Sequence, residues 1–214
     1  MMKIAVIGAT GRAGSAIVAE ALARGHQVVA VVRNAKKAQQ LFANQVTIRQ
    51  TDALAVSPAD FDGCDVIVDA FATRQEATQH LDLAARLVGL YRNTESPRLA
   101  FILGASSLRQ ADGSLVLADV LAKNAGAAWV ATPIQQAHEY TFLTWTENVN
   151  WVAVSPQFNF VPGPKTRYRV GKDEIMTNAA GQSTVTTGNL AAALIAEFET
   201  PHFVRQRFTV VDDE

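Results

Sequence analysis

The chain has 214 residues, of which 49% are hydrophobic and 18% are charged, and its formal net charge is −1. This length suits one domain with a full core, and the composition is that of a compact globule rather than a disordered chain. A net charge this small gives no overall field that would attract nucleic acid or an anionic membrane, so we expect neither as a partner.

The cysteine content and the length of the apolar runs indicate the cellular compartment in which the protein is expected. The single cysteine, Cys64, cannot form a disulfide within the chain, which fits a reducing environment. The first apolar run, Ile4–Ile7, is too short for a secretion signal, and no stretch approaches the roughly 20 apolar residues that a spanning helix needs. We therefore expect a cytoplasmic protein, either a monomer or a weak homodimer.

Apolar runs of strand length alternate with segments of helical period in the first half of the chain. Lys3–Ile7 is a short apolar run that ends at Gly8, which predicts a strand buried on both faces. The segment Gly14–Arg24 carries apolar residues at helical spacing and ends at Gly25. The pattern then predicts a strand at Gln27–Val32, a helix at Ala35–Phe42, strands at Val46–Arg49 and Asp65–Asp69, and a helix at Gln75–Tyr91.

The second half continues the alternation with two interruptions. Residues 106–130 mix polar, glycine and apolar residues without a clear period, and residues 157–187 are rich in Gly, Pro, Asn and Thr. We expect loops and short strands in the latter segment. The remaining expected elements are strands at Arg98–Leu103, Trp151–Ser155 and Arg207–Val211, and helices at Ile134–Asn148 and Leu190–Glu199.

Strands that alternate with helices predict an α/β fold with a Rossmann-type, doubly wound parallel sheet. We find no internal repeat or linker in the sequence. Residues 1–214 are therefore expected to form one dinucleotide-binding domain, in which residues 156–187 form a small lobe on the substrate side.

Three glycines stand between the first predicted strand and the first predicted helix. At the spacing of Gly8, Gly11 and Gly14, the first allows a tight turn and the second lets the backbone approach a pyrophosphate. The third lets the helix pack close to the sheet. Phosphates would then lie at the helix N-terminus, where free N–H groups favour negative charge. The alternative is a tight turn without a ligand.

The end of the second predicted strand indicates which dinucleotide fits. A carboxylate there would hold the ribose 2′-hydroxyl of NAD, but this strand ends in Arg33, with Lys36 and Lys37 close behind. An arginine can bind a 2′-phosphate through two parallel donors, and Arg12 could supply a second cation. We predict NADP(H) in preference to NAD(H). A solvated helix start remains the alternative interpretation of these cations.

Several stretches resemble a known family. Ile4–Gly14 resembles the opening of the atypical short-chain dehydrogenases, and the whole chain looks like their small NAD(P)H-binding group, which is similar to NADH-flavin reductases, biliverdin reductases and NmrA-like proteins. Val31–Asn34, Trp151–Pro156 with the following Gly163, and Arg205–Val210 support the resemblance. The resemblance runs nearly from end to end, but only the glycine loop is highly specific.

The resemblance implies a set of cofactor contacts at the carboxyl ends of the predicted strands. The glycine loop would hold the pyrophosphate, Arg33 the 2′-phosphate and Asp52 the adenine edge. Residues after the fourth strand would flank the adenosine and ribose, and residues after the fifth and sixth strands would surround the nicotinamide. The implied residues are Gly8, Thr10, Gly11, Arg12, Ala13, Gly14, Arg33, Asp52, Ala70, Phe71, Ala72, Gly104, Ala105, Ser106, Pro156, Phe158 and Asn159.

The chain departs from the family at the catalytic pair. Typical short-chain dehydrogenases use Tyr-x-x-x-Lys, in which the lysine lowers the tyrosine pKa. Tyr140 stands in about the right region, but the residue four positions on is Thr144, and the pattern occurs nowhere in the chain. The catalytic candidates are Ser106, Tyr140 and His138. Ser106 is equally well a loop hydroxyl without function, and a lone helical histidine such as His138 is more often a surface residue.

Flavin reduction needs no such pair, because a hydride can pass to a stacked acceptor while solvent supplies the proton. We therefore expect an NAD(P)H-dependent oxidoreductase that reduces FMN, FAD, a quinone or a similar flat small molecule. One alternative is a redox sensor that binds the dinucleotide without turnover. Another is a sugar-nucleotide epimerase or dehydratase, for which 214 residues leave little room. The scattered histidines have no ligand spacing, so we expect no metal.

Overall fold

The computed structural model describes residues 1–213, which form an α/β domain around an eight-stranded sheet. The strands follow one another in the order β3-β2-β1-β4-β5-β6-β10-β8, which is the Rossmann order with two further strands added at one edge. The ten strands are β1 (Lys3–Ile7), β2 (Gln27–Val32), β3 (Thr47–Gln50), β4 (Val66–Asp69), β5 (Thr94–Ile102), β6 (Val149–Ser155), β7 (Asn159–Val161), β8 (Tyr168–Gly171), β9 (Thr184–Thr186) and β10 (Gln206–Asp212).

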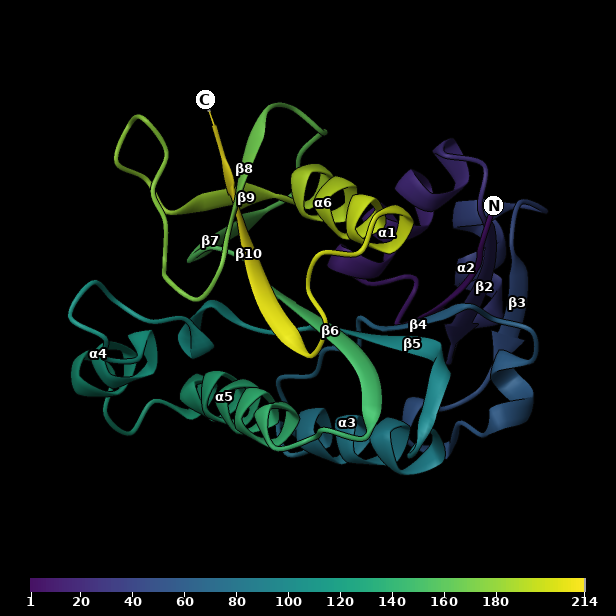
Figure 1. Cartoon of the computed structure of the whole chain (residues 1–214), viewed down its shortest axis with the longest axis horizontal. Coiled ribbons are helices and arrows are strands. Elements are labelled where there is room, and N and C mark those ends of the chain that lie inside the picture. The colour runs from purple at the N-terminus through teal and green to yellow at the C-terminus, as the bar shows by residue number, and fades with distance from the viewer. Residues whose placement is uncertain (214) are drawn as a thin grey trace.

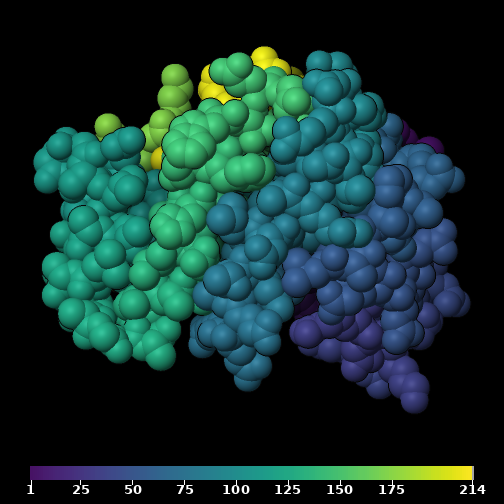
Figure 2. Space-filling model, turned by 90° about the horizontal axis from the view of Figure 1, so that it is seen from below, coloured from purple at the N-terminus to yellow at the C-terminus, as the bar shows by residue number. Residues whose placement is uncertain are grey.

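Helices cover both faces of the sheet. Figure 1 shows α1 and α6 together on one face and α3 and α5 on the other, with α4 beyond the end of α5. Figure 2 looks at the molecule from below, where the segments of α3, α4 and α5 form the surface. The helices are α1 (Arg12–Ala23), α2 (Ala35–Phe42), α3 (Gln79–Leu90), α4 (Val116–Lys123), α5 (Ala131–Thr144) and α6 (Thr187–Glu199).

The two cores follow from the alternation of side chains along each buried strand. On β1, Ile4 and Val6 join the core beneath α1 and α6, whereas Ala5 and Ile7 join the core beneath α3 and α5. Neither face of this strand meets water, which is why its sequence is a continuous apolar run rather than an alternating one. The prediction of a Rossmann-type α/β fold is confirmed.

Two details of the fold go beyond what the sequence predicted. The sheet is parallel from β3 through β10, but β8 pairs antiparallel with β10 at the edge. Residues 106–130, which showed no helical period, contain α4. Its inner face buries only Val116 and Val120, so one turn of apolar residues gives too short a repeat to detect.

The predicted strand and helix types are correct, but several ends differ. The helix expected from Gln75 begins at Gln79, because residues 73–78 form a turn in which Thr73 Oγ1 accepts a hydrogen bond from Glu76 N. The fifth strand begins at Thr94 rather than Arg98. Such ends depend on local hydrogen bonds that hydrophobic periodicity does not report.

The segment after β6 forms its own small sheet. β7 and β9 pair in parallel, and the buried side chain of Gln157 anchors the segment to the main sheet. Gln157 Nε2 donates to Thr209 Oγ1 of β10 at 2.8 Å, and its Oε1 accepts from Met176 N at 2.9 Å. The expected short strands of residues 157–187 are therefore present, held in place by a buried amide.

Candidate functional site

The glycine loop joins β1 to α1 in a very tight turn. Gly8 has a φ of +74°, and its N–H donates to Val31 O at 3.1 Å. A Cβ at Gly8 would lie 2.7 Å from Ala70 O, and a Cβ at Gly14 would overlap the carbonyl group of Gly8. Only glycine therefore fits both positions, the first because of its conformation and the second because α1 starts so close to the strand.

The start of α1 is left open for an anion. Gly11 is the N-cap, so no side chain caps the helix, and no acidic residue lies in its first turn. Free N–H groups and the positive end of the helix dipole therefore face the solvent side of the loop. Residues Arg12 and Ala13 of this turn line a cavity of about 620 Å³.

The cavity runs along the carboxyl ends of five neighbouring strands. In the sheet order β2-β1-β4-β5-β6, the residues that follow these strands and line the cavity are Arg33, Gly8, Ala70, Gly104 and Pro156. Four strand spacings of about 4.8 Å separate the first strand from the last, a span of about 19 Å. The cavity is therefore long enough for an extended dinucleotide, with its two ends on opposite sides of the glycine loop.

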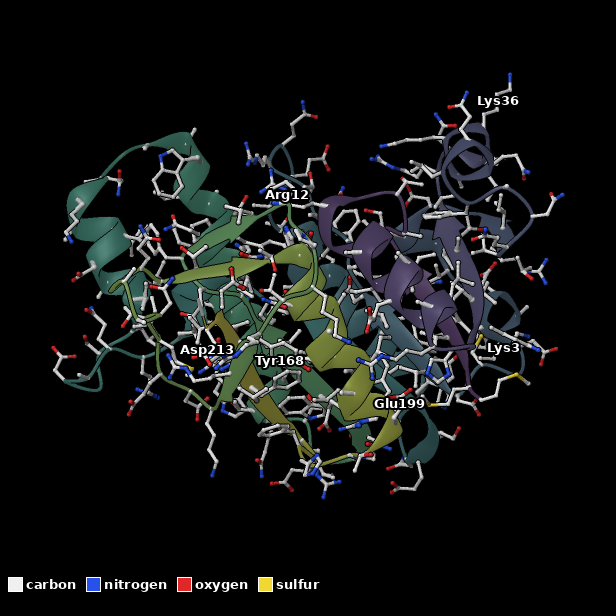
Figure 3. All side chains as sticks on the ribbon, turned by 90° about the horizontal axis from the view of Figure 1, so that it is seen from above. Lys3, Arg12, Lys36, Tyr168, Glu199 and Asp213 are labelled. Carbon is white, nitrogen blue, oxygen red and sulfur yellow. The ribbon has the colours of Figure 1, made fainter. Side chains whose placement is uncertain are left out.

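Four cations and no carboxylate line the cavity among the described residues. Arg33 and Lys37 lie at the start of α2, Arg12 in the glycine loop, and Arg74 in the loop after β4. The neighbouring Lys36 points away from the molecule in Figure 3. Uncompensated cations of this number favour a ligand with several negative charges.

The Arg12 side chain crosses from the glycine loop to β7. Its Nη1 donates to Phe160 O at 3.0 Å, and Figure 3 shows Arg12 reaching toward that strand. Both residues also line the cavity. Arg12 therefore lies on the β7 side of the loop, whereas Arg33 lies beyond the other side.

The residues at the far end of the cavity carry no charge of their own, although the Arg12 guanidinium reaches the edge of this end at Phe160 O. Gln136 of α5 packs its side-chain amide against Gly104, and a Cβ on this glycine would overlap the amide oxygen. Pro156 and Phe160 complete this end, which we call the Gly104 end.

Comparison with known proteins agrees with this geometry. A family model described as NAD(P)H-binding matches residues 8–201. The chain belongs to this NAD(P)H-binding family. The open helix N-terminus, the glycines and the cations of the cavity fit the nicotinamide dinucleotide that this family binds.

Relatives extend over the full chain. An uncharacterised protein of Bacillus subtilis, YwnB, is 32% identical over 99% of both chains. Two solved structures cover 100% of both chains: a protein from Lactobacillus casei at 41% identity and a TM-score of 0.94, and a candidate NADH-flavin reductase from Streptococcus pneumoniae at 29% identity and a TM-score of 0.87. The resemblance to the NADH-flavin reductase-like group is confirmed.

The structure brings most of the expected cofactor residues together. The predicted cofactor residues that line the cavity are Gly8, Thr10, Gly11, Arg12, Ala13, Arg33, Ala70, Phe71, Ala72, Gly104 and Pro156.

Six expected cofactor residues lie outside the lining. Asp52 Oδ1 accepts a hydrogen bond from Leu54 N and so caps a short 3₁₀ turn, while its neighbour Thr51 lines the cavity. Asn159 Nδ2 donates to Thr184 Oγ1 and so joins β7 to β9. The other four are Gly14, which lies behind the loop, Phe158, which is 59% exposed, Ala105 and the buried Ser106.

Other lining residues were not expected from the sequence. Lys37, Asn34 and Thr51 lie close to the carboxyl ends of β2 and β3, so a wider search around strand ends would have found them. Arg74 and Gln136 carry no such signal, because a loop and a distant helix bring them in. Phe160 of β7 also lines the cavity.

The three catalytic candidates lie outside the cavity lining. Ser106 is buried, and its Oγ donates to Pro133 O at 3.0 Å. His138 is exposed on α5. Tyr140 donates its hydroxyl to Asp173 Oδ1 at 3.1 Å, and its ring lies under the Arg207 guanidinium at 3.9 Å.

The surroundings of Tyr140 do not activate it as an acid. Burial raises the pKa of Tyr140, although the nearby Arg207 acts in the opposite direction. Arg207 itself pairs with Asp173 at 2.7 Å and has a fully buried side chain. Tyr140 therefore belongs to a buried network that attaches the loop around Asp173 to α5 and β10.

Residues 1–213 contain no group of three or more His, Cys, Asp or Glu side chains placed to hold a metal ion. Within that range, none of the helices has the length and hydropathy required to cross a membrane.

Proposed function

We propose that the protein is an NADPH-dependent oxidoreductase that reduces a flat acceptor such as a flavin or a quinone. The observation that carries the proposal is the cavity itself, which has an open helix N-terminus, several cations and a far end whose own residues carry neither a charge nor an acid–base side chain. The name of the Streptococcus pneumoniae relative, a candidate NADH-flavin reductase, supports the same class of acceptor.

The preference for NADP(H) is supported by charge at the end of β2. Arg33 and Lys37 line the cavity there, and Asn34 caps α2 by accepting a hydrogen bond from Lys37 N at 3.0 Å. A 2′-phosphate would meet two cations and a helix N-terminus. The acidic residue that would hold the 2′-hydroxyl of NAD is absent from the described lining.

The proposed chemistry follows from which side chains surround the Gly104 end. A reduced nicotinamide bound there would supply a hydride. The described lining contains no carboxylate, histidine, tyrosine or cysteine, so the protein provides no evident proton donor at this point. Gln136 and the backbone at Gly104 would orient the nicotinamide, and Phe160 offers an aromatic face to a stacked ring. The acceptor would take its proton from solvent.

The test is NADPH oxidation with FMN, FAD and a series of quinones, measured against the uncatalysed rate. We expect at least one flat acceptor to be reduced much faster with the enzyme than without it. We also expect the KM for NADPH to be lower than the KM for NADH. Rates equal to the uncatalysed background for every acceptor would refute the reductase.

The missing proton donor also favours a second function, that of a redox sensor. A sensor would bind the oxidised and the reduced dinucleotide with different affinities while turning over no acceptor. Calorimetry with both forms of the cofactor, next to the acceptor series, separates the two functions.

A further inference from the structure

Two carboxyl groups are buried behind the cavity, on the face of the sheet that α3 and α5 cover. Asp69 is the last residue of β4 and is 5% exposed, and Glu139 of α5 is 2% exposed. Because side chains alternate along a strand, Asp69 lies on the same face as Ile67, which packs in the core beneath α3 and α5. We refer to Asp69 and Glu139 as the carboxyl pair.

The carboxyl pair lacks the donors that buried negative charges need. Asp69 Oδ1 accepts one hydrogen bond, from Phe71 N at 3.0 Å. Glu139 Oε2 is buried without a hydrogen-bond partner among residues 1–213. An ionised carboxylate without compensating donors is costly in an apolar interior, and two neighbouring ones also repel each other.

Burial is the main influence on the pKa values of both carboxyl groups. It raises the pKa of Asp69 to about 7, although the hydrogen bond from Phe71 acts in the opposite direction. Burial, and then the charge of Asp69, raises the pKa of Glu139 well above its ordinary value. At neutral pH the pair therefore retains at least one proton.

The strands, loop and helix next to Asp69 offer no compensating charge. On α3 the titratable neighbour is His80, and burial lowers its pKa, so the ring is neutral at physiological pH. β5 places the apolar Phe101 opposite Asp69 in the register. In the loop after β4, the side chain of Arg74 lines the cavity.

Charged groups around α5 are already engaged elsewhere. Tyr140 donates to Asp173, which also pairs with Arg207. His138 is exposed on the outer side of the helix. Asp69 is the charged neighbour that acts on the pKa of Glu139.

Each member of the carboxyl pair is joined to one wall of the cavity. The hydrogen bond from Phe71 N to Asp69 shapes the turn that places Ala70, Phe71 and Ala72 in the lining, and Ala70 O lies against Gly8. Glu139 follows Gln136 by one helical turn on the same side of α5, and Gln136 packs against Gly104. Each wall of the cavity is thus connected to one carboxyl group of the pair.

We propose that Asp69 and Glu139 together keep one proton at neutral pH, and that both act as positioning residues for the cofactor cavity. With the proton present, β4 and α5 pack together and both walls hold their places. When the last proton leaves, two buried charges repel, the turn after β4 and the Gln136 segment separate, and dinucleotide binding weakens. This inference rests on the proposed function, because it concerns binding at that site.

The test measures the dissociation constant of NADPH by calorimetry between about pH 6 and pH 9.5, over which carboxyl groups with ordinary pKa values stay ionised. For the wild type we expect the affinity for NADPH to fall by about tenfold as the pH rises through the alkaline range. A tenfold change corresponds to a difference of about one unit between the pKa of the carboxyl pair in the bound protein and its pKa in the free protein. Circular dichroism at each pH confirms that the protein stays folded.

Two variants with neutral side chains of the same shape, and one control variant, show which carboxyl group causes the pH dependence of NADPH binding. Glu139→Gln keeps the shape of the side chain but cannot lose a proton, so its affinity should remain flat over the alkaline range. Asp69→Asn removes the neighbouring charge, so the transition should move to lower pH. Glu147→Gln changes an exposed carboxylate just after α5 and should leave the wild-type profile unchanged.

Infrared spectroscopy tests for the retained proton without any cofactor. At neutral pH the wild type should show the carbonyl stretch of a protonated carboxylic acid, and the band should be weaker in Glu139→Gln, in which only Asp69, with a pKa of about 7, can hold a proton. Absence of that band in folded wild-type protein would overturn the proposal, as would an alkaline transition that is the same in Glu139→Gln. If NADPH does not bind at any pH, the proposed function fails, and the infrared band alone decides whether the pair keeps a proton.

Discussion

The two ends of the cavity are built in different ways. At one end, Arg33 and Lys37 lie within five residues of each other, next to the glycine loop, and the chemistry is that of cations and free backbone amides. At the Gly104 end, the lining comes from β7 and α5 and from residues after β5 and β6, and these residues carry no charge of their own. The phosphate groups of a dinucleotide would therefore meet short sequence patterns, whereas the acceptor would meet a shape assembled from distant segments.

The largest expected effect is at the glycine loop, which both ends share. Gly14→Val should remove binding of NADPH and NADH alike, by more than about 100-fold, because its side chain would overlap the carbonyl group of Gly8 and displace the start of α1. Calorimetry measures the loss, and circular dichroism shows whether the domain still folds. Gly89→Ala is the matched control: a Cβ there meets nothing within 4 Å, so binding should not change.

A smaller and selective effect is expected at the cationic end. Arg33→Asp should weaken NADPH by about 10- to 100-fold, the value of a lost charged hydrogen-bond pair, and should leave NADH nearly unchanged. The dissociation constants of both cofactors are compared with those of Lys36→Asp, whose side chain points away from the cavity (Figure 3). Equal losses for the two cofactors would show that Arg33 does not recognise the 2′-phosphate.

The smallest effect is expected at Tyr140, behind the Gly104 end. Tyr140→Phe removes the hydrogen bond to Asp173, which should cost about 1 kcal/mol in the free energy of unfolding. The turnover number with any accepted flavin or quinone should stay within about twofold of wild type, because the hydroxyl does not line the cavity. Denaturant unfolding and steady-state kinetics provide the two values. A fall in turnover of about 100-fold or more would make Tyr140 a catalytic acid after all.

Sequence patterns predicted this fold well wherever the signal was local. The strand β1 and the glycine loop follow from a continuous apolar run and three spaced glycines, and each needs only its own neighbours in the chain. The ends of α3 and α5 were less predictable, because turns such as the one at Thr73 depend on single side-chain hydrogen bonds.

The functional residues divide in the same way. Arg33 was recognisable because it directly follows a strand in the position where dinucleotides are distinguished. Gln136 was not, because it reaches the cavity only when α5 packs on the sheet beside Gly104. Ser106 and Tyr140 looked catalytic from their positions in the chain, but their hydroxyl groups bond to Pro133 O and Asp173 instead.

The sequence by itself determined the Rossmann-type α/β fold and the cationic dinucleotide loop, because periodicity, glycine spacing and charge act over a few residues. Only the tertiary structure decided which residues form the Gly104 end and that Asp69 and Glu139 are buried together. Gln136 lies 32 residues after Gly104, and Glu139 lies 70 residues after Asp69. The physical cause of both arrangements is the packing of α5 against β4 and β5, which leaves no repeating pattern in the chain.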